Sequence, residues 1–254
     1  MIRDTILNQL KLTGELSLLT KDFFRGIVTK PVYFGRIMEQ MIRIGNESVP
    51  ITLTIGTVTG LLMTLQFGYG LAKFGGTLYV PAIVSLSLFR ELAPIFTSLI
   101  FAGRIGSSIS AEIGAMNVTQ QIDAIRALGT SPIRVLVVPK VLASVISLPL
   151  LATLAAVMGV LGGMAIAYIE FGMPTGFYIN KVLATIKFSD VFGSMFKCAI
   201  FGLVVGILGC YRGFQTKEGT RGVGNAATWV VVHSSTIILI SDFFLSKLLI
   251  LLFG

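Results

Sequence analysis

Five long apolar stretches constrain this chain more than any other feature. Each holds at least about 20 mostly apolar residues, the length that an α-helix needs to cross a bilayer. Because unpaired backbone amides are costly in hydrocarbon, such stretches are expected to be helical. The predicted spans are residues 49–72, 81–103, 135–169, 188–211 and 226–253. The sequence therefore predicts an all-α integral membrane protein with five transmembrane helices.

Composition supports this class. The chain is 54% hydrophobic and 13% charged, whereas soluble domains average about 25% charged residues. Its net charge is +8, but most basic residues lie in the polar segments, which indicates membrane orientation and head-group contact and no nucleic-acid binding. Cys198 and Cys210 share one apolar span without metal-ligand spacing, so we expect small buried side chains and no metal site.

The N-terminal region has a different pattern. Apolar residues recur at steps of three or four, and most charges fall elsewhere on the helical wheel. This predicts an amphipathic helix that lies along the membrane interface and is broken by Pro31. Residues 32–47 are interpreted as a connecting elbow. The predicted regions are therefore an N-terminal helix with its elbow over 1–47 and a five-helix transmembrane domain over 48–254. The apolar stripe consists of Leu12, Leu16, Leu19, Phe23 and Ile27.

Lysine and arginine counts predict the orientation. If the N-terminus is cytoplasmic, the inside segments hold fourteen basic residues and the outside loops hold three. The positive-inside rule therefore places the N-terminus in the cytoplasm and the C-terminus on the opposite side.

A polar island, residues 107–132, separates the second and third spans on the predicted cytoplasmic side. Ile122, Ile125 and Leu128 fall on one helical stripe, and Asp123 and Arg126 have the spacing of an ion pair. Gly129 and Pro132 are helix stop signals. The pattern favours a short amphipathic docking helix over an ordinary polar loop.

Charged residues inside the spans are the candidate functional residues, because charge is costly in a bilayer. Arg90 and Glu91 are adjacent in the second span, and Lys197 lies midway along the fourth. A Glu91–Lys197 pair across helices is predicted. The three residues either form a structural ion pair or line a cavity for an anionic or zwitterionic head group. Three acidic residues nearer the span ends, Glu170, Asp190 and Asp242, are expected to reach the interface or a partner chain.

Other features add less. No G-x-x-x-x-G-K-[ST] phosphate loop occurs, so this chain is not expected to hydrolyse ATP. His233 is expected to make a helix-packing hydrogen bond. Gln66, Phe67 and Tyr69 form either an interfacial belt or the mouth of a lipid-sized cavity. Small-residue pairs predict close helix packing; they are Gly56/Gly60, Gly159/Gly163, Gly202/Gly206 and Gly209/Gly213.

Several motifs resemble those of the MlaE family of permeases, and the resemblance covers essentially the whole chain. They are Phe89–Pro94 (FRELAP), Ala102–Gly106 (AGRIG), Ala111–Met116 (AEIGAM), Gln121–Gly129 (QIDAIRALG), Pro139–Lys140, Gly209–Gly213 (GCYRG) and Gly219–Gly224. The resemblance implies the membrane subunit of an ABC transporter for phospholipids in a bacterial inner membrane, with a periplasmic C-terminus.

The resemblance also implies partners and site residues. The expected partners are a second copy of the chain, a cytoplasmic ABC ATPase dimer (MlaF-like) that carries ATP and magnesium, and a periplasmic MCE-domain hexamer (MlaD-like). Some systems add a STAS-domain protein (MlaB-like). No cofactor is expected on this chain. The implied coupling helix is Gly114–Gly129, with Glu112, Gly114, Met116, Gln121, Ile122, Asp123, Ile125, Arg126, Leu128 and Gly129 as coupling residues. The implied lipid cavity is lined by Met63, Gln66, Phe67, Tyr69, Arg90, Glu91 and Lys197.

Two other functions stay open at this point. An ion-coupled secondary transporter would use Glu91, Lys197 and His233 as a proton relay, but such transporters usually show internal repeats, and none is obvious here. A non-transporting envelope scaffold would keep its activity when Arg90, Glu91 and Lys197 are neutralised.

Overall fold

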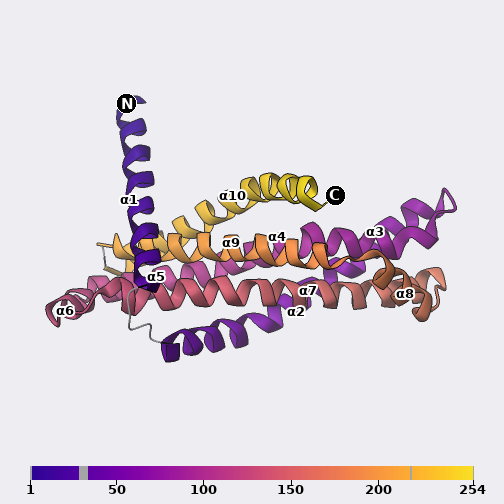
Figure 1. Ribbon diagram of the computed structural model, residues 1–254, viewed down its shortest axis with the longest axis horizontal. Helices are drawn as coiled ribbons and strands as arrows, with labels where there is room; N and C mark the ends of the chain where they lie inside the picture. The colour runs from indigo at the N-terminus through magenta and orange to yellow at the C-terminus, as the bar shows by residue number, and fades with distance from the viewer. Residues whose placement is uncertain (1, 29–33, 218, 254) are drawn as a thin grey trace. The chain divides into compact units, whose positions relative to one another are not determined.

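The computed structural model describes residues 2–28, 34–217 and 219–253, and within them all regular structure is helical (Figure 1). The α-helices are α1 (Ile2–Val28), α2 (Phe34–Ala72), α3 (Val80–Ser87), α4 (Ala93–Phe101), α5 (Ser107–Val118), α6 (Gln121–Ala127), α7 (Val138–Phe171), α8 (Thr175–Thr185), α9 (Phe188–Phe214) and α10 (Gly219–Phe253). A 3₁₀ turn covers Thr77–Tyr79, and π-helical turns cover Leu88–Leu92, Ala102–Gly106 and Ile133–Val137.

The five predicted spans are confirmed. Within the described residues, five helical stretches are long and apolar enough to cross a membrane: Phe34–Ala72, Thr77–Val118, Ile133–Phe171, Phe188–Phe214 and Gly219–Leu252. All five are longer than the predicted apolar runs, because the helices continue into the polar flanks. The second stretch contains two of the π-helical turns, each of which shifts the register of the side chains that follow.

The segment predicted as a connecting elbow, residues 32–47, is helical where the structure describes it. From Phe34 onward these residues are the first turns of α2. Ile37 and Ile44 are both buried and lie two helical turns apart, so one apolar stripe carries the helix through this polar stretch. Pro50 lies inside α2 without ending it. The predicted break at Pro31 lies outside the described residues.

The chain forms two compact units, each built from parts of several long helices. Unit 1 comprises Met1–Ile44, Phe101–Val145 and Gly202–Ile237, and unit 2 comprises Gly45–Ile100, Ile146–Phe201 and Ile238–Gly254.

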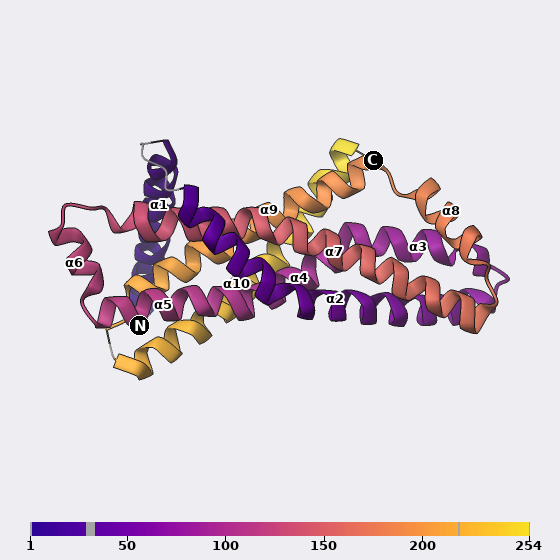
Figure 2. The ribbon, with the colours of Figure 1, turned by 90° about the horizontal axis from the view of Figure 1, so that it is seen from below.

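Unit 2 is held together by close packing of α2 against α7. A Cβ added at Gly56 would meet the backbone of Ala155, and one added at Gly60 would meet the backbone of Gly159. The predicted small-residue packing is therefore confirmed here. At one end of the unit α8 packs on α3 (Figure 2). The ring of Tyr178, which belongs to α8, is completely buried.

Replacing Gly60 by alanine is expected to destabilise unit 2. The added methyl group would overlap the Gly159 carbonyl, and backbone on both sides leaves little room for adjustment. Overpacking of this kind lowers the free energy of unfolding by about 1–3 kcal/mol. Thermal unfolding in detergent measures the effect. Gly70→Ala is the matched control, since nothing lies within 4 Å of a Cβ at Gly70 in the same helix; an equal loss in both variants would contradict the prediction.

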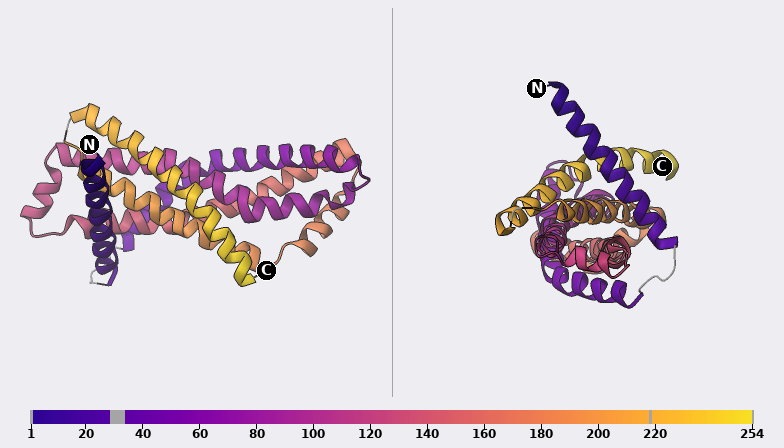
Figure 3. Two further views of the ribbon diagram at one scale, coloured as in Figure 1. Left: turned by 90° about the horizontal axis from the view of Figure 1, so that it is seen from above. Right: turned by 90° about the vertical axis from the view of Figure 1, so that its left-hand side faces the viewer.

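Unit 1 contains α1, the first turns of α2, α5, α6 and the adjoining parts of α7, α9 and α10. Glycines again allow close approach, for example Gly202 against the backbone of Ser144 and Gly213 against Ile113. The helix α1 is unbroken (Figure 3) and contacts the π-helical turn Ile133–Val137. Phe23, from the predicted stripe, is buried.

Polar side chains also link α1 to the rest of unit 1. The Glu15 carboxylate accepts hydrogen bonds from the Tyr211 hydroxyl at 2.8 Å and from the Gln215 amide at 2.7 Å. This helix therefore packs against the rest of unit 1 through both apolar and polar side chains, and its position along a membrane interface stays a prediction.

Candidate functional site

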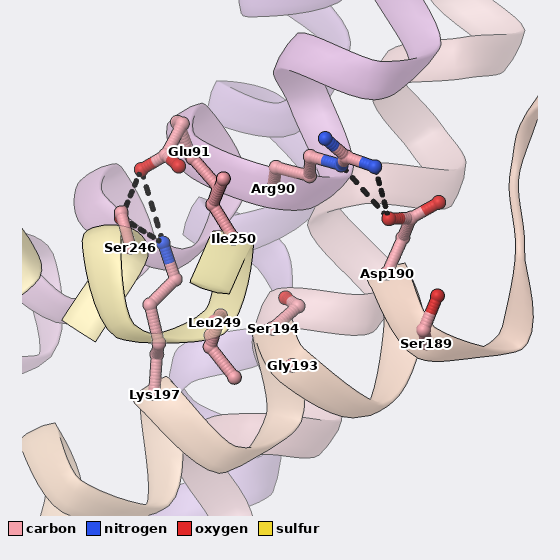
Figure 4. Close-up of a pocket in the computed structure, with 10 residues that line it drawn as sticks. All are labelled: Arg90, Glu91, Ser189, Asp190, Gly193, Ser194, Lys197, Ser246, Leu249 and Ile250. Carbon is pink, nitrogen blue, oxygen red and sulfur yellow. Dashed lines mark hydrogen bonds and ion pairs between the residues drawn. The ribbon is translucent and has the colours of Figure 1, made fainter. Parts of the chain in front are cut away.

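The most unusual side chain of unit 2 is Lys197, which lies in the span formed by α9 and is 1% exposed. Its ammonium group lies 3.0 Å from Glu91 Oε2, 3.0 Å from Asp242 Oδ1 and 3.0 Å from Ser246 Oγ. The Ser246 hydroxyl in turn donates to Glu91 Oε2 at 2.9 Å. The predicted Glu91–Lys197 pair is confirmed, and Figure 4 shows that the two side chains approach from different helices.

The electrostatics of this group are those of one cation between two anions. An ammonium group removed from water needs an opposite charge and its hydrogen bonds satisfied, and the three oxygens match its three donors. Asp242 is buried, whereas the Glu91 side chain is 39% exposed. Glu91 belongs to the π-helical turn Leu88–Leu92, and such turns often occur at functional sites. The group thus offers a fixed, charged surface beside an opening.

A second ion pair lies next to the first. Arg90 donates to Asp190 Oδ1 from Nε at 2.8 Å and from Nη2 at 2.7 Å. The other Asp190 oxygen accepts the backbone N–H of Lys187 at 2.9 Å, which stabilises the first turn of α9. Arg90 and Glu91 point to different partners, as neighbours on a helix are expected to do.

The placement predicted for Asp190 and Asp242 is wrong. Both carboxylates are buried within unit 2 and pair with cations of the same chain, because each lies on a helix face that turns toward a basic residue. A sequence signal was present for one of them. Asp242 and Ser246 are four residues apart in an apolar helix, so they lie on one face and form a polar stripe.

A pocket opens between these two ion pairs (Figure 4). Its polar wall consists of Arg90, Glu91, Asp190, Ser194, Lys197 and Ser246, and Leu249 and Ile250 add an apolar side. The cavity has a volume of about 60 Å³, which has room for a few water molecules. It is too small for the acyl chains of a lipid.

The structure separates the predicted cavity residues of α2. Met63 and Phe67 pack against the buried residues Val80, Val84 and Leu88. Gln66 is exposed, and Tyr69, 54% exposed, donates a hydrogen bond to Glu170 at 3.0 Å. None of the four lines the pocket beside Lys197. Their role toward lipid stays a prediction.

In unit 1 the polar island forms two helices. Gln120 adopts a left-handed φ of 59°, so the predicted coupling range 114–129 is divided between the end of α5 and α6. The predicted Asp123–Arg126 pair is confirmed at 2.9 Å, and Gly129 has the positive φ of a helix stop.

The predicted coupling residues differ in exposure. Ile122 is fully buried, Ile125 is half-buried and Leu128 is 81% exposed. One residue that the sequence interpretation missed fixes the turn before α6: the Asn117 amide donates to the carbonyls of Phe214 and Thr216, at 3.1 and 2.9 Å. Nothing in the sequence indicated this contact, because the segment that contains Asn117 was interpreted as a docking surface.

Comparison with known proteins identifies the family to which this chain belongs. It matches the family described as Permease MlaE over residues 37–248. A probable ABC transporter permease protein of Synechocystis sp. is 40% identical over 232 residues, 89% of this chain and 88% of the relative. One from Rickettsia bellii is 36% identical over 235 residues, 92% of this chain and 91% of the relative. The chloroplastic protein TRIGALACTOSYLDIACYLGLYCEROL 1 of Arabidopsis thaliana is 31% identical over 221 residues, 87% of this chain and 63% of the relative. This multi-pass membrane protein therefore belongs to the MlaE permease family.

Proposed function

We propose that this chain is the membrane subunit of an ABC transporter that moves phospholipids between the inner and outer membranes and so maintains outer-membrane lipid asymmetry. The observation that carries the proposal is Lys197, buried in a membrane span and held by two carboxylates beside a small polar pocket. Such a group is expensive in a bilayer unless function requires it. Membership of a permease family supports the same reading.

The partners belong to the proposal. ATP is hydrolysed by a separate cytoplasmic ATPase dimer, which binds α6 and its flanking residues. A periplasmic ring of MCE-domain subunits receives or delivers the lipid, and a STAS-domain protein is a further partner in some assemblies. Two copies of this chain form the permease in the inner membrane, with cytoplasmic N-termini and periplasmic C-termini.

The size of the pocket fits a lipid path completed by a second copy. A phospholipid needs an apolar cavity for its tails and a few polar contacts for its head group. The pocket beside Lys197, at about 60 Å³, supplies only the polar contacts. We place the tails in a cavity at the homodimer interface, with Gln66 and Tyr69 of each copy near its outer mouth. ATP-driven closure of the ATPases moves α6 and changes the volume of that cavity.

Co-purification tests this proposal. The chain is co-expressed with the ATPase and MCE-domain subunits of the same organism, and lipids bound to the purified complex are identified by mass spectrometry. We expect the three subunits to elute together. The purified complex is expected to contain a higher fraction of phospholipid than the membrane from which it was extracted. Glu91→Ala and Lys197→Ala complexes that still assemble are expected to carry less phospholipid.

The alternatives give different results. A chain that purifies without any ATPase and moves substrate on an ion gradient would support a secondary transporter. A complete complex without bound lipid and without ATP-dependent transfer would support a scaffold.

A further inference from the structure

Unit 1 contains a buried lysine of its own. Lys140 lies in the first turn of α7 and is 3% exposed. Its ammonium group is 2.8 Å from Glu112 Oε2, in α5, and 3.5 Å from the side-chain oxygen of Gln40, in α2. The same Glu112 oxygen lies 3.5 Å from Nη1 of Arg43, also in α2. One carboxylate oxygen therefore joins three helices.

The ion pair of Glu112 and Lys140 joins the two helices on either side of α6 in the sequence. Glu112 lies in the helix that leads into α6, and Lys140 lies in the helix that leads out of it. Both chain segments that hold α6 thus meet at one ion pair, and the third participant is the start of α2. The helix α2 continues to Ala72, so its first turns belong to the same helix as Met63 and Gln66.

The surroundings of the ion pair differ from the rest of unit 1. A polar cavity of about 290 Å³ borders Lys140, Glu112 and Gln40, together with Arg36 and Glu39. By contrast, the contacts of Gly202 with Ser144 and of Gly206 with Val141 are tight. Close-packed interfaces resist small displacements, whereas charged side chains beside a polar cavity can exchange partners. The cavity therefore gives the charged side chains of α2, α5 and α7 room to rearrange at the point where they meet.

A purely stabilising role does not explain the choice of residues. A buried ion pair is often no more stabilising than well-packed apolar residues of similar size, and its best-attested use is to specify one arrangement over others. We propose that Glu112 and Lys140 are positioning residues that transmit movement of α6 to α2, so that ATP hydrolysis on the partner drives lipid movement. This inference rests on the proposed function.

The test compares lipid moved per ATP hydrolysed in reconstituted complexes. Lys140→Met and Glu112→Gln each remove one charge, Lys140→Arg restores the cation, and Lys73→Met changes an exposed loop lysine as a control. We expect Lys140→Met and Glu112→Gln complexes to assemble and hydrolyse ATP, while lipid moved per ATP falls about tenfold, within the usual range of coupling between sites. Lys140→Arg is expected to recover most of the ratio, and Lys73→Met to leave it unchanged.

Each result decides the question. An unchanged ratio in both charge-removing variants overturns the inference. If Lys140→Met fails to assemble, Glu112→Gln decides in the same way, and failure of both to assemble shows a role in folding only and also overturns it. A wild-type complex without ATP-dependent lipid transfer would contradict the proposed function itself. Normal wild-type transfer with a normal ratio in the variants would contradict only this inference.

Discussion

A Lys197→Met variant is expected to lose both stability and lipid transport. The change leaves the carboxylates of Glu91 and Asp242 without their shared cation, and Asp242 is almost fully buried. Removing one partner from a buried ion pair costs about 3–5 kcal/mol. Thermal unfolding of the detergent-solubilised protein is expected to shift clearly downward. Lys247→Met, an exposed lysine on α10, is the control and is expected to unfold like the wild type.

A compensated variant separates stability from function. Glu91→Gln and Asp242→Asn, combined with Lys197→Met, remove the whole charged group while keeping nearly the same side-chain volumes. Because no charge is left unpaired, most of the lost stability should return. If Lys197 contacts the lipid head group, transport stays lost. Recovery of transport together with stability would show that the three residues form a structural ion pair and would contradict the cavity-lining role.

A Leu128→Asp variant is expected to lose its ATPase partner while keeping its fold. Leu128 follows α6, is 81% exposed and belongs to the predicted coupling surface. An apolar side chain that inserts into a partner's groove typically contributes about 2 kcal/mol or more when it is a hot spot, which corresponds to about thirtyfold in Kd. Co-purification and a titration of the ATPase against the detergent-solubilised permease measure the change.

The matched comparison is Ile122, which lies in α6 but is buried. Ile122 is fully buried in the same segment, so Ile122→Ala is expected to lower the unfolding temperature and to weaken ATPase binding only through misplacement of α6. Leu128→Asp, in contrast, is expected to leave the unfolding temperature unchanged. Undiminished ATPase binding by Leu128→Asp would show that α6 is not the docking element.

The spans were predictable from the sequence because their signal is local. A run of apolar residues long enough to cross a bilayer has only helical solutions in lipid, and five such runs gave five helical spans. The Asp123–Arg126 pair was predictable for the same reason, since both residues lie within one turn. The helical structure of residues 34–47 was not predicted, because the charged residues there obscure the apolar stripe formed by Ile37 and Ile44.

Contacts between helices were harder to predict, because they depend on how each helix is rotated. The Glu91–Lys197 pair was expected from the cost of isolated charge in a span, but that argument does not supply Asp242 or Ser246 as further partners. The ion pair of Glu112 with Lys140 joins residues on either side of α6, and nothing in their spacing indicates it. The π-helical turns also rotate the residues that follow by amounts that a regular 3.6-residue pattern does not include.

ATP-dependent lipid transfer tests the central claim most directly. The chain is reconstituted with its ATPase and MCE-domain subunits in vesicles that contain a fluorescent phospholipid, and transfer to or from acceptor vesicles is followed after ATP is added. The account predicts transfer that requires ATP, stops when the ATPase is inactivated by mutation, and is lost in the compensated Lys197 variant. Transfer that proceeds equally without ATP, or no transfer by a fully assembled complex, would contradict it.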